Sequence, residues 1–212
     1  MKTSTASVAS ISLALVLGLG GCAKARDTGF GFTDHPKALP PPPPVSFVWP
    51  TPAGWKHETI PFPLDFAPSL PYRGSEELRF APGFFDPDAP GYFSYVFVWW
   101  IEAGPRLERA TVEGHLKEYF VGLTKAVAKD DFEPDLSRIE ARLEANREPG
   151  LAGTVRTIDA FKTRREVLLN VRAKTGACGD RHFLIVKASP RPMSDPMWAS
   201  LHDTAAAFQC RP

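Results

Sequence analysis

The stretch Tyr92-Phe-Ser-Tyr-Val-Phe-Val-Trp-Trp-Ile101 decides the fold. Aromatic and β-branched side chains dominate it, and these residue types favour the pleated backbone of a strand. Its second half is apolar at consecutive positions, so that both faces of the strand carry apolar side chains. A strand of this kind is covered on both sides. The stretch therefore predicts a central strand with a packing layer against each face of its sheet.

Shorter strands are expected before and after this segment. Alternation of apolar with charged residues indicates strands, although residues 139–145 consist of good helix formers and are also compatible with a helix. Residues 175–180 hold two glycines and an aspartate, which is typical of a hairpin connection. Besides 92–101, the expected strands are residues 56–60, 77–81, 139–145, 154–161, 166–173 and 182–188.

Two amphipathic helices are also expected. Thr111 is a suitable N-cap for the first, and Asp195 with Pro196 suits the start of the second. Apolar residues three and four positions apart form the buried faces, which comprise Val112, Leu116, Phe120, Leu123 and Val127 in the first helix and Trp198, Leu201, Ala205 and Phe208 in the second. The order of elements predicts an α+β domain with two helices packed on an antiparallel sheet.

This order of elements resembles the PsbP/Mog1-like superfamily, which includes small bacterial DcrB-type lipoproteins. The likeness rests on Trp55 with Pro61 and Pro63 near the start, on the first helix, and on the final helix after a strand. It covers most of residues 55–210, whereas the proline-rich stretch 61–90 departs from a compact version of that fold. The resemblance implies an α/β/α sandwich and a non-catalytic, accessory role.

The amino-terminal segment has the features of a lipoprotein signal peptide. Lys2 precedes an apolar run that has the length of a signal-peptide core and is too short to span a bilayer. The run ends in Leu19-Gly20-Gly21-Cys22, which resembles the lipobox of bacterial lipoproteins. Small residues just before the cut allow the backbone to enter the narrow cleft of the signal peptidase, and the cysteine thiol accepts the diacylglyceryl group. We expect removal of residues 1–21 and a lipid anchor on Cys22. An ordinary secretory signal with a chance cysteine is the alternative.

Residues 22–50 are expected to tether this anchor to a single globular domain over residues 51–212. Pro40 to Pro44 form an unbroken run, which adopts extended polyproline II and acts as a stiff spacer, although such runs also bind aromatic grooves. The anchor implies a cell-envelope protein held at a membrane surface. In a Gram-negative cell, Ala23 after the cysteine favours the outer membrane, facing the periplasm.

Two cysteines remain once Cys22 carries lipid. In an oxidising envelope, Cys178 and Cys210 are expected to form a disulfide, and two free thiols are the alternative. Closing a loop of about 33 residues stabilises a fold by about 3.7 kcal/mol in the chain-entropy model. A metal site would need two more ligands nearby, so that neither a metal nor another cofactor is expected.

Charge and motifs exclude several functions. The chain has 25 Lys and Arg against 24 Asp and Glu, and removal of Lys2 with the signal peptide leaves 24 of each. A nucleic-acid partner is not expected, because it would require a basic face. No zinc-protease helix, serine elbow or phosphate loop is present in the sequence, and no catalytic residue is assigned. A hydrolase acting on cell-wall or lipid material remains the alternative, and it would require polar groups scattered in the sequence, such as His57, Asp86 or His182, to converge in space.

A high density of aromatic residues between positions 84 and 100 is the feature of the sequence that stands out from an ordinary composition. Exposed aromatic clusters mark recognition surfaces, whereas buried rings fill a core. The expected binding surface consists of Phe84, Phe85, Tyr92 and Phe93. The leading hypothesis is a non-enzymatic envelope lipoprotein whose domain binds or supports an envelope protein or a glycan.

Overall fold

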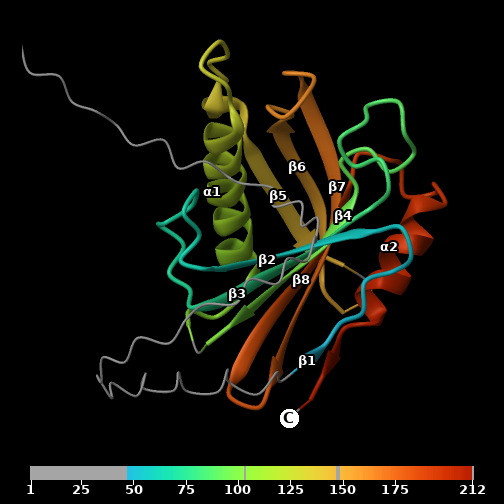
Figure 1. Ribbon diagram of the computed structural model, residues 1–212. Coiled ribbons are helices and arrows are strands. Elements are labelled where there is room, and N and C mark those ends of the chain that lie inside the picture. Colours follow the sequence, from blue (N-terminus) through green and yellow to red (C-terminus); the bar gives the residue numbers. More distant parts are fainter. Residues whose placement is uncertain (1–46, 103, 147–148, 212) are drawn as a thin grey trace, which may run out of the picture. The chain divides into compact units, whose positions relative to one another are not determined.

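The computed structural model describes residues 47–102, 104–146 and 149–211. Seven strands in this part of the chain form one antiparallel sheet, namely β2 (Lys56–Phe62), β3 (Gly74–Phe80), β4 (Tyr95–Ile101), β5 (Glu140–Ala145), β6 (Leu151–Ile158), β7 (Glu166–Cys178) and β8 (Arg181–Ser189). Their order across the sheet is β2-β3-β4-β8-β7-β6-β5, which places β4 in the interior of the sheet, two strands from one edge (Figure 1). The predicted α+β class and the strand at 139–145 are confirmed.

Two helices, α1 (Arg109–Val127) and α2 (Met197–Ala206), cover opposite faces of this sheet (Figure 1). All seven residues of β4 are buried. Phe97 and Trp99 belong to the larger core, which includes α1. Val96 and Val98 belong to a second core, which includes α2. The apolar character of both faces of β4, which the sequence predicted, therefore serves two separate packing layers.

The connection between β2 and β3 is part of the larger core. Leu64, Ala67 and Leu70 are buried in this segment, although it has no regular secondary structure. It lies so close to α1 that a Cβ added at Gly122 would overlap the carbonyl group of Phe66. The connection therefore packs as an irregular layer beside the helix.

The second core needs more than α2 to close it. A short strand, β1 (Phe47–Val48), pairs with β9 (Gln209–Cys210), and Trp49 is buried. The Trp49 indole N–H donates to the Thr204 carbonyl at 2.7 Å. Residues 47–50 were expected in the tether, and that boundary is corrected here, because these apolar residues cover sheet surface that α2 leaves open. Cys22, the segment 1–21 and the proline run lie outside the described residues.

Local geometry explains two further differences from the predicted elements. β7 and β8 stay paired as far as Cys178 and Arg181, because Gly179, with φ at +57°, makes a two-residue turn. The hairpin is therefore longer than predicted. α1 begins at Arg109, before the predicted cap Thr111. α2 begins at Met197 with Pro196 at its N-cap position, and the Asp195 carboxylate just before it accepts the Met197 N–H at 2.8 Å.

The two cysteines of the folded unit lie at disulfide distance. The Cα atoms of Cys178 and Cys210 are 5.8 Å apart, as the predicted pairing requires. The bridge joins the end of β7 to β9, which follows α2. No helix in the described part of the chain is both long enough and apolar enough to cross a membrane.

Candidate binding groove

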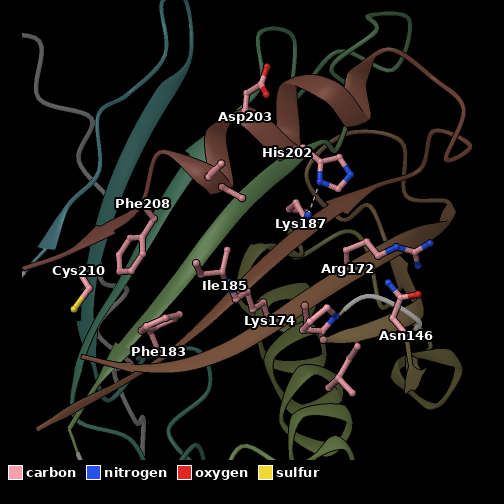
Figure 2. A pocket seen from close by; sticks show the side chains of 16 residues that line it. Asn146, Arg172, Lys174, Phe183, Ile185, Lys187, His202, Asp203, Phe208 and Cys210 are labelled. Atoms are coloured by element: carbon pink, nitrogen blue, oxygen red, sulfur yellow. Dashed lines mark hydrogen bonds between the residues drawn. The ribbon is translucent and has the colours of Figure 1, made fainter. Parts of the chain in front are cut away.

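A hollow of about 620 Å³ lies beside α2 (Figure 2). The helix packs on β8 and β4, and the α2-side face of β7 beyond them is open. The walls come from α2, β8, β7 and the turn between β5 and β6. Small-molecule sites in proteins have volumes of about 300–1,000 Å³, so that this groove is large enough for a ligand.

The two ends of the groove differ in chemistry. Figure 2 shows the rings of Phe183 and Phe208 at one end and the cationic side chains of Arg172 and Lys187 at the other. Ile185 lies between the two ends. The groove therefore runs from an apolar end to a basic end.

Strand register produces this gradient. Alternate residues of a strand share a face, which places Phe183, Ile185 and Lys187 in a row along β8. On β7, Lys174 lies opposite Ile185, and Arg172 lies opposite Lys187. Gly176 on β7 is the cross-strand partner of Phe183 on β8. A Cβ atom on this glycine would overlap the phenylalanine ring. Glycine at this position thus leaves room for the ring at the apolar end.

The basic end carries an electrostatic cost. Arg172 and Lys187 are direct cross-strand partners, and like charges placed opposite each other destabilise a sheet. Seven ion pairs occur among the described residues, and none involves Arg172 or Lys174. Asp203 is the one carboxylate among the residues that line the groove in the described chain. The groove therefore concentrates positive charge in a protein whose overall charge is balanced.

His202 on α2 contacts the basic end. Its Nδ1 lies 2.7 Å from the Lys187 ammonium, which is the donor when the imidazole is neutral (Figure 2). This contact ties α2 to β8 across the groove. Because neighbouring residues on a helix point in different directions, His202 and Asp203 do not form an acid–base pair.

The sheet face continues beyond the groove. A second hollow, of about 480 Å³, lies over β5, β6 and β7, and Arg172 and Asn146 line both hollows. Arg142 and Glu144 are further lining residues. The Arg142 guanidinium donates to Glu140 at 3.1 Å. In contrast to Arg172, this arginine is thus neutralised by a neighbour.

The aromatic residues predicted as a binding surface mostly lie inside the protein. Phe84 and Phe93 are 7% and 3% exposed, and the Phe93 N–H donates to the Phe84 carbonyl at 3.0 Å as the connection folds back on the core. Tyr92 is half-buried and donates its hydroxyl hydrogen to Asp159 at 2.7 Å. Phe85 alone of the four is well exposed, at 47%. The expectation of a four-ring surface is therefore wrong, because the rings of Phe80, Tyr95 and Phe161 pack against this segment.

The polar residues considered for a hydrolase do not converge. His57 pairs with Arg79 on β3, which in turn pairs with Val96 on β4. Val96 pairs with Lys187 on β8, and His182 lies five residues from that lysine. Spacings of about 3.3 Å per residue and 4.8 Å per strand separate the two histidines by well over 10 Å. Asp86 lies on the exposed connection between β3 and β4.

The buried carboxyl groups lie outside the groove. Burial raises the pKa of Glu76 to about 8, against the opposing effect of hydrogen bonds from Trp99 and Tyr119. Burial also acts to raise the pKa of Asp159, but hydrogen bonds, with Tyr92 the strongest, outweigh it and lower the pKa. Within the described ranges, no cluster of three or more His, Cys, Asp and Glu side chains could hold a metal ion.

The groove was not predicted from the sequence. One signal for it was present, since Arg172 lies on one strand of the predicted hairpin, Lys174 directly follows that strand, and Lys187 lies on the other strand. Comparisons with protein-family models, with curated proteins and with solved structures found no match to the chain. The resemblance to the PsbP/Mog1-like superfamily stays a prediction.

Proposed function

We propose that this protein is a non-catalytic envelope lipoprotein that binds a ligand in the groove beside α2. The supporting observation is the pairing of Arg172 with Lys187 on adjacent strands, with no described carboxylate bound to Arg172. An anionic ligand would relieve the repulsion between these cations. His202 and Asp203 point in different directions from α2, which favours a binding role for the groove over acid–base chemistry.

The lipid anchor is the second part of the proposal. It rests on the lipobox-like sequence that ends at Cys22. An acylated cysteine would hold the folded unit at a membrane surface, where two or more acyl chains give lasting attachment. The proline run would then keep the groove clear of that surface.

Metabolic labelling with radioactive palmitate tests the anchor. The native chain is expected to incorporate label and to sediment with membranes, whereas Cys22→Ser is expected to do neither. Label on Cys22→Ser, or its absence from the native chain, would refute acylation at this cysteine.

Site-specific crosslinking in intact cells tests the groove. Lys174 is exposed and lines the groove, so a photo-crosslinking amino acid at this position should capture the occupant. Arg165 is also exposed but does not line the groove, and the same amino acid there is the matched control. An adduct at position 174 and none at 165 supports the proposal, and no adduct at 174 contradicts it.

A further inference from the structure

We infer, building on the proposed function, that the occupant of the groove is a single-chain anionic amphiphile such as a fatty acid. Its anionic head lies at Arg172 and Lys187. Its alkyl chain runs past Ile185 toward Phe183 and Phe208. This orientation follows from the chemical gradient of the groove.

Charge complementarity selects an anionic head. Arg172, Lys174 and Lys187 line the groove, and Asp203 is the single described acidic side chain among the lining residues. A guanidinium binds a carboxylate or phosphate through paired hydrogen bonds, and such charge-assisted bonds are stronger than neutral ones. Because Arg172 makes no described ion pair, its guanidinium is available to a ligand. A cationic head would instead add to the repulsion already present.

The apolar end selects an alkyl chain. The rings of Phe183 and Phe208 lie 5.3 Å apart between centroids, and Ala205 and Ile185 line the wall beside them. Each methylene buried against such a surface increases affinity by up to about fourfold. A small inorganic anion would leave this end of the groove unused.

The axis of the groove matches an extended chain. Lys187 and Phe183 are four residues apart on β8, and a strand rises about 3.3 Å per residue, so that the basic and apolar ends are about 13 Å apart. A medium-length alkyl chain spans this distance.

Calorimetric titration of residues 23–212 tests this inference. Every described contact lies within 47–211, so a protein of residues 23–212 keeps the whole folded unit. Because it lacks the expected lipid anchor, it needs no detergent, which would compete with the probes. The probes, all used below micelle-forming concentrations, are decanoate, octanoate, acetate and decyltrimethylammonium. Decanoate is expected to bind up to about fifteenfold more tightly than octanoate, since two methylenes separate them, and at least tenfold more tightly than acetate or decyltrimethylammonium. Equal binding of decanoate and decyltrimethylammonium, or of decanoate and acetate, would overturn the inference.

Two variants test the position of the head. Arg172→Gln combined with Lys187→Gln is expected to weaken decanoate binding at least tenfold, whereas Arg165→Gln is expected to leave it unchanged. Thermal unfolding verifies that the double variant is folded, and the comparison of probes on the native sequence does not depend on any variant. Unchanged decanoate affinity in a folded double variant would refute the assigned head position.

The two proposals fail in different ways. An adduct at position 174 in cells, without preferential decanoate binding in solution, overturns the amphiphile and leaves the binding groove supported. An acidic polypeptide captured at position 174 does the same. Absence of both the adduct and decanoate binding overturns both.

Discussion

Glu76 illustrates the residue scale, because its neighbours and not its sequence context decide its chemistry. Its side chain is fully buried, and its carboxyl accepts a hydrogen bond from the Trp99 indole at 3.1 Å. Burial raises the pKa of Glu76 to about 8, and the charges of Glu58 and Glu77 add to the rise. At neutral pH this group is therefore largely a neutral acid inside the core.

The stability of the protein should consequently fall as pH rises. An unfolded glutamate has a pKa near 4.3, so that between about pH 4.3 and 8 the folded state holds a proton that the unfolded state has released. Unfolding free energy therefore decreases across this window, by at most about 1.4 kcal/mol per pH unit. Glu76→Gln is expected to remove this dependence and to be more stable than the native protein at pH 8. Urea denaturation from pH 5 to 9 measures it, and identical pH profiles for the two proteins would exclude the assignment.

Some single-residue properties could be predicted from the sequence and others could not. The prediction that Cys178 pairs with Cys210 needed only a count of cysteines and the expectation of an oxidising compartment. The burial of Phe84 and Phe93 needed the positions of Tyr95 and Phe161, whose rings pack against them. The sequence alone holds no information on a contact such as that between Phe93 and Phe161, which are 68 positions apart.

At the scale of elements, hydrophobic periodicity predicted the strands and helices whose faces are defined by their own sequence. β4 and both helices were recognised because their own side chains define their faces. β1 and β9 were missed, because a two-residue strand exists only through its partner. The groove was missed for a related reason, since it depends on how far α2 extends across the sheet.

Close packing between α1 and the segment after β2 gives a prediction at this scale. Gly122→Ala is expected to destabilise the protein by about 1–3 kcal/mol, because the new methyl group would overlap the Phe66 carbonyl and force a shift of packed backbone. Gly114 lies on the same helix with no atom within 4 Å of an added Cβ. Gly114→Ala should therefore stabilise by roughly 0.5–1 kcal/mol. Thermal and urea unfolding measure both, and equal effects of the two substitutions would contradict this packing.

At the scale of the whole molecule, the Cys178–Cys210 bridge joins the end of the long hairpin to the segment after α2. The two cysteines are 32 positions apart. Cys178→Ser combined with Cys210→Ser is expected to lower the unfolding free energy by about 3–4 kcal/mol in the chain-entropy model. Urea denaturation of the double variant measures the loss. The native protein in a reducing agent should match the variant, and an unchanged midpoint in both would argue against a stabilising bridge.

The same sheet provides two different surfaces. On one side α1 and the irregular segment beside it cover the larger core, whereas on the other side α2 leaves part of β7 open. The open part carries Arg172 and Lys174, and neither of them takes part in an ion pair with a described residue. The incomplete cover and the charge that it leaves exposed are the two observations on which the proposed binding site rests.

Amide chemical shifts give the position of a bound ligand most directly. In isotope-labelled residues 23–212 titrated with decanoate, we predict the largest shifts at Arg172, Lys174 and Ile185, with Phe85 unchanged. The largest shifts around Phe85 and the connection between β3 and β4, with β7 and β8 unaffected, would contradict it.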